Sequence, residues 1–546
     1  MPVYKSLVRL VFMLCVCGGI CLVLFSSASA MTPDVQQLMV SFPFSDGFES
    51  GSFGSGWTPG SAANGVAQIR TDDPHSGTYH AFLGQHQGGQ AYVTLDLLIN
   101  LANQSDVYLD FWWRTTGDVS WVGNAEDSGI YLSDDNGNSW HKIMDFQDNF
   151  HYSHDVINLA NAAAIKGLSL NDHFRIRFYF ERYSGSRSGG IRLDDIRLTQ
   201  SSQTVASFPV QDNFETQIFQ QGLYLRSLGQ GVAKISNDAP HSGSYHVSLE
   251  QQVEGNAQAA LVWLVDLSNK SDVYLDFWWR TTGDVSWVGN AERSGVYLSD
   301  DNGASWKKIK DFSDNLHYSH EIINLANAAA NQGLSLNKYF RVKFHFERYG
   351  GSRIGGIRLD DIRLTTSSQV KATFPFQNGF ESATFVKGLY PKSLGQGIGE
   401  ISSETPHSGT KHVFLGQRAS GYALAALFVL IDLPNETDVY LDFWWRTAGD
   451  LSWSGNAERS GIYISDDNGS SWKKIKDFSD NLQYKHETIN LTDAAVNQGL
   501  RLNDHFLISF HYERYGGSRL GSLRIDDIRL WNGSSTNRVY LPFIEK

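Results

Sequence analysis

Cysteine is almost absent from this chain of 546 residues, which contains only Cys15, Cys17 and Cys21. All three lie within the first thirty residues, so the remainder of the chain has neither a disulfide nor a thiolate nucleophile. Whatever fold residues 31–546 adopt must therefore be held together by its own hydrophobic core.

Long apolar runs and an excess of basic residues are also missing. Beyond residue 30 no segment is long and apolar enough to cross a bilayer as a helix. Acidic residues outnumber basic ones by 58 to 45, which gives a formal net charge of −13. This balance disfavours nucleic acids and anionic membranes as partners.

The first thirty residues have the features of a signal peptide. Lys5 and Arg9 precede an apolar stretch, and Ala28-Ser29-Ala30 supplies the small residues before a cleavage site. We expect cleavage before Met31, which removes two positive charges and takes the net charge from −13 to −15. The mature protein is thus predicted to be secreted or held at the cell surface.

The rest of the chain is one unit repeated three times with a period of 166 residues and no insertions. This period relates Trp112 to Trp278 and Trp444, Phe48 to Phe214 and Phe380, and Asp195 to Asp361 and Asp527. We place the units at 42–200, 208–366 and 374–532, with a tail at 533–546. Repeats this long are tandem domains, since solenoid repeats have about 20–50 residues.

Each unit has the alternating pattern of β-strands. In "VYLDFWWRT", Val107, Leu109, Phe111 and Trp113 fall on one face, and "FRIRFYFER" (174–182) alternates in the same way. Further strands are predicted at 66–70, 78–83, 91–98, 129–133, 140–144 and 189–198. One helix is predicted in "NLANAAAIKG", ending at Gly167. The pattern indicates an all-β protein of antiparallel sandwiches.

The octapeptide "SDDNGNSW" (133–140) recurs in each unit and has two interpretations. As a hairpin turn resembling an Asp-box, Asp135 accepts hydrogen bonds from turn amides, Gly137 takes a positive φ and Trp140 packs beneath the hairpin. As a calcium loop it would need a distal bidentate glutamate, and none follows at the required distance. We therefore predict a structural turn.

Several motifs in a fixed order resemble a known family. "FSDGFESGSFGSGW", "DDPHSGTYHAFL", "VYLDFWWRTTGD", "FRIRFYFER" and "GGIRLDDIRL" follow one another in the first unit. This order resembles the MAM-type jelly roll with a concanavalin A-like fold, especially the bacterial version attached to immune-inhibitor-type metallopeptidases. It is also similar to jelly-roll carbohydrate-binding modules. The resemblance implies three tandem antiparallel jelly-roll β-sandwiches, although the disulfide cysteines of animal MAM domains are missing.

The resemblance also implies a structural Ca²⁺ in each unit. In such domains the glutamate of the early "FE" and an aspartate of the late "DD" meet at one edge of the sandwich. Oxygen ligands from distant segments suit a hard cation that takes six to eight of them. The metal ligands predicted on this basis are Glu49, Asp195, Glu215, Asp361, Glu381 and Asp527. A solvated edge or a hydrogen-bonded turn is the alternative.

An aromatic and polar row lies opposite the apolar face of "VYLDFWWRT". Sugars bind aromatic faces flanked by planar hydrogen-bonding groups, so this row is a candidate ligand platform. Its predicted members are Tyr108, Trp112, Arg114, Tyr274, Trp278, Arg280, Tyr440, Trp444 and Arg446. Tyr179 and Glu181 are expected on the same face. The alternative is an arginine–carboxylate ladder that only covers the sheet.

Histidines give no metal site of their own. His151 and His154 could suggest a zinc pair, but the third unit has Gln483 in place of the first histidine. Because zinc needs several fixed nitrogen or sulfur ligands, we reject this interpretation.

Hydrolase motifs are missing as well. The segments that begin at His320 and His486 lack the second histidine of HExxH, no GxSxG occurs, and the acid triplet of jelly-roll glycosidases is absent. Linked weak sites gain apparent affinity, so three copies favour binding over catalysis.

We therefore predict a non-catalytic binding or adhesion protein whose partner is extracellular glycan or a surface protein. A structural spacer or surface-layer component, and an unrecognised glycoside hydrolase, are the alternatives. The tail "VYLPFIEK" is a candidate sorting or anchoring tag, or a strand that adds to a neighbour's sheet edge.

Overall fold

The computed structural model describes residues 38–117, 127–183, 188–283, 293–350, 354–449, 459–515 and 520–533. The predicted signal peptide and residues 534–546 of the tail lie outside the described residues. Within the described ranges, no helix combines the length and the apolar character that a membrane span requires.

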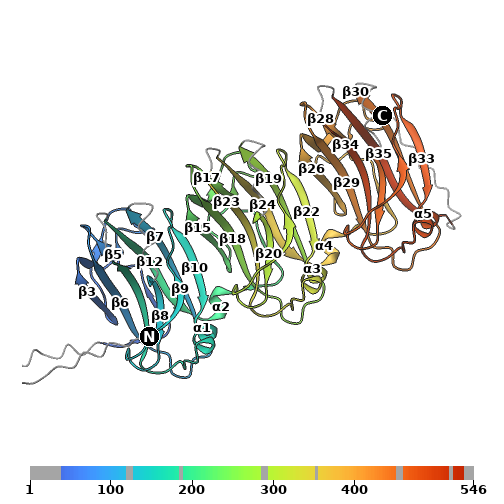
Figure 1. The fold of residues 1–546 in the computed structure, drawn as a ribbon. Helices are drawn as coiled ribbons and strands as arrows, with labels where there is room; N and C mark the ends of the chain where they lie inside the picture. The colour runs from blue at the N-terminus through green and yellow to red at the C-terminus, as the bar shows by residue number, and fades with distance from the viewer. Residues whose placement is uncertain are drawn as a thin grey trace, which may run out of the picture. The chain divides into compact units, whose positions relative to one another are not determined.

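The chain forms three tandem β-sandwiches, each made of two mostly antiparallel sheets (Figure 1). The first sheet of the first sandwich has the order β1-β6-β11-β8-β9, with β3 also on β6, and the second has the order β10-β7-β12-β5-β4, with β2 on β12. The first-sheet strands are β1 (Val40–Ser41), β3 (Trp57–Ala63), β6 (Ala91–Asn100), β8 (Gly129–Ser133), β9 (His141–Asp145) and β11 (Phe174–Arg182). The second-sheet strands are β2 (Phe44–Asp46), β4 (Gly65–Arg70), β5 (His80–Gln85), β7 (Tyr108–Gly117), β10 (Ser153–Asn158) and β12 (Gly189–Thr199).

The second sandwich repeats this topology. Its first sheet contains β13 (Ala206–Ser207), β15 (Leu223–Gly229), β18 (Ala257–Asp266), β20 (Gly295–Ser299), β21 (Lys307–Asp311) and β23 (Phe340–Arg348). Its second sheet contains β14 (Val210–Asp212), β16 (Gly231–Ser236), β17 (His246–Gln251), β19 (Tyr274–Gly283), β22 (Ser319–Asn324) and β24 (Gly355–Thr365).

The third sandwich differs only in its first sheet, where the contact between Ala372 and Ile431 is an isolated bridge. The first-sheet strands are β26 (Leu389–Gly395), β29 (Ala423–Ile431), β31 (Gly461–Ser465), β32 (Lys473–Asp477) and β34 (Phe506–Arg514). The second-sheet strands are β25 (Phe376–Asn378), β27 (Gly397–Ser402), β28 (His412–Gln417), β30 (Val439–Gly449), β33 (Lys485–Asn490) and β35 (Gly521–Asn532).

Short helices accompany the sheets: α1 (Leu159–Ile165), α2 (Ser201–Thr204), α3 (Leu325–Asn331), α4 (Ser367–Val370) and α5 (Leu491–Asn497). The Asn158 side chain caps α1 by accepting from the amide of Asn161. Gly167, with φ of 74°, follows the helix, as predicted.

The core of each sandwich lies between its two sheets. Val107, Leu109, Phe111 and Trp113 belong to the buried cluster of the first sandwich, together with the apolar positions of β11. The alternation read from the sequence therefore predicted the inward faces correctly, and the all-β fold of three tandem jelly-roll sandwiches is confirmed.

The recurring octapeptide is a hairpin turn between β8 and β9. Asp135 accepts hydrogen bonds from the Ser133 hydroxyl (2.7 Å) and from the amide of Ser139 (2.9 Å). Gly137 has φ of 91° and donates its amide to Ser133 Oγ. The hydroxyl of Ser139, its amide and the Ser133 hydroxyl hold the pKa of Asp135 well below its usual range. The Trp140 ring lies 3.8 Å from the Arg177 guanidinium.

Consecutive sandwiches make the same contacts at both junctions. Arg226 pairs with Asp155 at 2.8 Å, and the equivalent Lys392 pairs with Glu321 at 2.5 Å. At each junction a backbone amide also donates to a serine hydroxyl at 3.3 Å, from Ser227 to Ser153 and from Ser393 to Ser319.

The two outermost faces lack this chemistry. At the first face, Thr58 and Gly60 occupy the positions of Tyr224 and Arg226. At the last, Lys485 replaces the junction serine and pairs with Glu487 at 3.3 Å, taking the place on this glutamate that Lys392 takes on Glu321. The positions that join sandwiches are thus polar or self-paired at both ends of the array.

Candidate functional site

The outer face of the second sheet carries most of the polar and aromatic groups singled out from the sequence. On β7, Asp110, Trp112 and Arg114 point away from the core, which contains the residues between them. Trp112 lies opposite His154 of β10, and Arg114 lies opposite Arg192 of β12. Adjacent strands therefore place these side chains in one row.

Both faces of the Trp112 ring are covered by histidines. The His75 ring stacks on it at 3.7 Å and 15°, and the His154 ring stacks on the other side at 4.5 Å and 9°. The same stacks form around Trp278 and Trp444. The ring edge, not its faces, is therefore what these tryptophans offer to a ligand.

The predicted tyrosines are placed differently from the tryptophans. Tyr108 is 0 % exposed and Tyr274 is 2 % exposed, each within a cluster that includes residues of the following sandwich. Burial raises the pKa of Tyr274 to about 12. Tyr440 is half-buried and stacks on Trp531 at 5.1 Å. Of the predicted row, the first two tyrosines are thus inaccessible at the surface.

From the sequence, Tyr179 and Glu181 were expected on the same face as Tyr108, and this expectation is wrong. They belong to β11 of the first sheet, whereas β7 belongs to the second. Alternation within a strand says which residues share a side, but not which sheet the strand joins.

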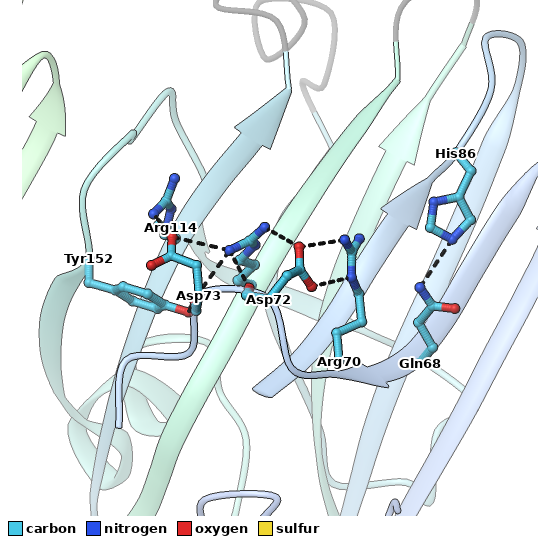
Figure 2. Close-up of polar contacts among 8 residues, drawn as sticks. Gln68, Arg70, Asp72, Asp73, His86, Arg114 and Tyr152 are labelled. Atoms are coloured by element: carbon cyan, nitrogen blue, oxygen red, sulfur yellow. Dashed lines mark hydrogen bonds and ion pairs between the residues drawn. The ribbon is translucent and has the colours of Figure 1, made fainter. Parts of the chain in front are cut away.

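A network of arginines and carboxylates crosses the same face in the first sandwich (Figure 2). Arg192 pairs with Asp72 at 2.7 Å and with Asp73 at 3.2 Å, and Asp73 also pairs with Arg114. Arg70 donates to Asp72 at 2.6 Å, and the Tyr152 hydroxyl donates to the Asp73 carbonyl at 3.1 Å. The ladder expected as the alternative to a ligand platform is present here.

The predicted metal ligands Glu49 and Asp195 accept hydrogen bonds from opposite ends of one loop, residues 75–79. Glu49 accepts the amides of Thr78 and Tyr79 at 2.9–3.0 Å. Asp195 accepts from His75 Nδ1 at 2.7 Å and from the Ser76 hydroxyl at 3.0 Å. The second and third sandwiches repeat this arrangement with Glu215 and Asp361, and with Glu381 and Asp527.

The neighbouring aspartate of each "DD" is buried and carries an unfavourable charge. Burial, assisted by the charge of Asp195, raises the pKa of Asp194 to about 6. The pKa values of Asp360 and Asp526 are raised to about 7 for the same reasons. In the second and third sandwiches, possible ligand atoms of a histidine and both aspartates lie within 4.8 Å of one another: His241, Asp360, Asp361 and His407, Asp526, Asp527. This donor set suits a cation.

A cavity of about 650 Å³ opens beside the Trp112 stack, where the first sandwich meets the second. Its wall contains aromatic rings, carboxylates and amides in close array. The rings are His75, Trp112, His154, Phe219 and Tyr224, the carboxylates are Asp46, Asp110 and Asp195, and the amides are Gln203, Gln220 and Gln221.

The sequence reasoning missed the second half of this cavity. Gln203 lies in α2 and Gln220 precedes β15, both outside the motifs that drew attention to β7. Only the position of the following sandwich brings them to Trp112. The "RTDDPHSG" segment was a usable signal for the arginine network, since it combines Arg70 with two acids.

No protein-family model matches the sequence, and no curated protein matches it. Among solved structures, the chain is similar to the tandem CBM22 modules of Xyn10C from Paenibacillus barcinonensis, with 10 % identity, 59 % of this chain and 96 % of that chain covered, and a TM-score of 0.20. It is similar to TmCBM61 in complex with β-1,4-galactotriose, with 19 % identity, coverage of 28 % and 94 %, and a TM-score of 0.19. For the glycoside hydrolase domain of Endo-D from Streptococcus pneumoniae R6, the identity is 12 %, the coverage 56 % and 43 %, and the TM-score 0.22. With TM-scores this low, these similarities carry no information on what the present chain binds.

Proposed function

We propose that this chain is a non-catalytic, secreted or cell-surface protein that binds glycan through its sandwich domains. The observation that carries the proposal is the cavity beside Trp112. The apolar edges of these rings, flanked by carboxylates and amides, suit a sugar, which has apolar C–H groups and hydroxyls that need planar hydrogen-bonding partners.

The carboxylates of the cavity favour binding over hydrolysis. Asp46 accepts from the Trp57 indole at 2.9 Å, Asp110 bonds His154 at 2.8 Å, and Asp195 bonds His75 at 2.7 Å. A glycosidase needs two carboxyl groups that face the sugar as acid and as nucleophile or base. Each acid here is instead engaged in holding the fold.

Glycan binding is tested by removing cavity amides that support no other described contact. We expect Gln203→Ala with Gln220→Ala to weaken retardation in gels containing neutral polysaccharides by about tenfold, since each amide supplies hydrogen bonds to hydroxyls. Gln147→Ala, an exposed glutamine away from the cavity, is the matched control. If the full chain is retarded by no polysaccharide and binds no glycan on an array, the spacer interpretation replaces this one.

We also propose that each sandwich holds a structural Ca²⁺ at the edge that Glu49 and Asp195 form with their counterparts. The buried neighbour Asp194 adds a further carboxylate to this donor set, and a bound cation would offset its charge. The ion would tie the first and last strands of a sandwich together and take no part in chemistry.

Calcium is tested on the intact chain by thermal unfolding. Millimolar Ca²⁺ is expected to raise the Tm by several degrees over the chelator-treated protein, because a ligand that binds only the folded state stabilises it. The triple variant Glu49→Gln, Glu215→Gln, Glu381→Gln should lose most of this shift, and the exposed Glu254→Gln should keep it. An equal shift in both variants would contradict the site.

The order of motifs supports a finer assignment of each sandwich as a MAM-like domain, located outside the cell after removal of the signal peptide. Appearance of the protein in the culture medium with Met31 as its first residue is the expected result.

A further inference from the structure

The outer face of every sandwich carries two arginines directly opposite each other on neighbouring strands. The pairs are Arg114 with Arg192, Arg280 with Arg358, and Arg446 with Arg524. Like charges at directly opposed positions destabilise a sheet. The second member of each pair is at least nine-tenths buried, so solvent screens the repulsion poorly. Each pair therefore needs an anion.

The first sandwich supplies that anion from its own chain. The Asp73 carboxylate reaches both members of the pair, with Arg192 at 3.2 Å and Arg114 as its second partner. Asp72 adds a second carboxylate on Arg192 at 2.7 Å. The pair is fully matched, as Figure 2 shows around Asp73 and Arg114.

The second and third sandwiches have lost this carboxylate but kept the loop that carried it. Ala239 and Thr405 occupy the position of Asp73, and φ is 60° at Asp73 and 52° at both replacements. The backbone thus follows the same left-handed course, and neither replacement carries a carboxylate. The Thr405 hydroxyl still accepts a hydrogen bond from Arg524, but it brings no negative charge.

One arginine in each of these pairs is left without a carboxylate. Arg358 still pairs with Asp238, and Arg524 pairs with Glu404 at 3.2 Å. Across the ranges that the structure describes, Arg280 and Arg446 make no ion pair. Burial and the charge of Arg358 lower the pKa of the Arg280 guanidinium, and the charge of Asp238 opposes this shift.

Aromatic rings support the unmatched arginines. The Arg280 guanidinium lies 5.4 Å from the ring centre of Tyr318, and that of Arg446 lies 5.7 Å from Tyr484. Such contacts with an aromatic ring limit the orientations of the planar guanidinium group, which can bind a carboxylate through two parallel hydrogen bonds.

We propose that the arginine pairs of the second and third sandwiches each bind a carboxylate of an acidic glycan, in the place that Asp73 takes in the first sandwich. This inference rests on the proposed glycan binding and names its class as uronic acid-containing. The internal occupant of the first sandwich is itself a carboxylate, which favours uronate over sulfate. The first sandwich is then self-occupied and binds no acidic sugar at this position.

The test restores the internal carboxylate. In affinity gels containing polygalacturonate or alginate, the full-length variant Ala239→Asp with Thr405→Asp is expected to bind at least tenfold more weakly than the parent chain. Ala239→Asn with Thr405→Asn has the same size without the charge and should keep parental affinity. Asp73→Ala frees the Arg114–Arg192 pair of the first sandwich and should strengthen retardation severalfold by adding a site.

Methyl-esterified polygalacturonate separates this inference from the proposed function. Retardation by the neutral ester but not by either acid polymer would overturn the uronate site while leaving glycan binding intact. Equal losses in the Asp and Asn variants would also overturn it, since a steric effect would then explain the result. Absence of retardation by any polymer would reject both.

Discussion

At the scale of single residues, one buried histidine in each sandwich stands out. His80, His246 and His412 begin equivalent strands and are 0 % exposed, and neither ring nitrogen has a hydrogen-bond partner in the described part of the chain. Burial and the nearby Arg192 or its counterpart lower the pKa of each imidazole to about 4. These rings are neutral in the folded protein.

These histidines should make the protein sensitive to acid. The pKa of each histidine in the folded protein lies below the unfolded value of about 6.5. The free energy of unfolding is therefore unaffected by these histidines above pH 6.5, and it decreases as the pH falls from 6.5 toward 4, because the unfolded chain binds protons that the folded protein does not. Each should contribute a loss of about 2–3 kcal/mol, since one pKa unit corresponds to about 1.4 kcal/mol. Urea unfolding at several pH values measures this slope.

The variant His80→Leu, His246→Leu, His412→Leu should flatten the slope between pH 6.5 and 4. Because the ring nitrogens bond nothing in the described ranges, leucine should cost little stability at pH 7. An unchanged slope would show that other groups cause the acid sensitivity.

At the scale of elements, alternation predicted the strands that carry the core. The predicted strand at 129–133 is β8, and that at 189–198 is β12 with one further residue. The missed strands β1, β2, β3 and β10 each pair with a single neighbour at the margin of a sheet and have little apolar alternation of their own. Pro59 and Gly60 within β3 further hid it.

The site was less predictable than the fold for reasons of register and neighbours. Asp73 and Arg192 are 119 positions apart, and only the pairing of β12 with β5 and β7 brings them together. Tyr108 pointed away from its own core, as alternation required, but the next sandwich covers it. A single repeat read alone cannot reveal what its neighbour buries.

The hairpin turn makes an element-scale prediction. Ser133 is 0 % exposed and its hydroxyl both donates to Asp135 and accepts from Gly137. Ser133→Ala should therefore cost about 1–2 kcal/mol, the value of two modest hydrogen bonds, measured by urea unfolding. The exposed Ser139→Ala keeps that buried hydroxyl and should cost less; the reverse order would contradict the proposed roles.

At the scale of the whole molecule, the repeated junction contacts couple neighbouring sandwiches. The side chains of Lys392 and Glu321 are only 16 % and 11 % exposed, so solvent screens their charges poorly. Glu321 also pairs with Lys310 at 2.8 Å, so removing Lys392 weakens the compensation of its charge without abolishing it. Arg226 is more exposed than Lys392, so its pair with Asp155 should contribute less.

Cutting one junction pair should loosen the connection that it spans. Lys392→Ala is expected to increase the rate of proteolysis in the 366–372 linker severalfold and to lower the Tm by a few degrees. Lys485→Ala removes a cation from the outer face of the third sandwich and should change neither the cleavage rate nor the Tm. Identical cleavage rates in both variants would mean that the sandwiches behave independently.

The outer faces of the first and third sandwiches lack the residues that join neighbouring sandwiches, and this determines where a further sandwich could be added to the array. A second copy of residues 208–366 spliced in after the first would present Arg226 to Glu321 and find a matched neighbour on each side. The same copy fused behind the third sandwich would meet Lys485, already satisfied by Glu487. Growth of this protein, by gene duplication or by an engineer, is therefore favoured from the middle outward.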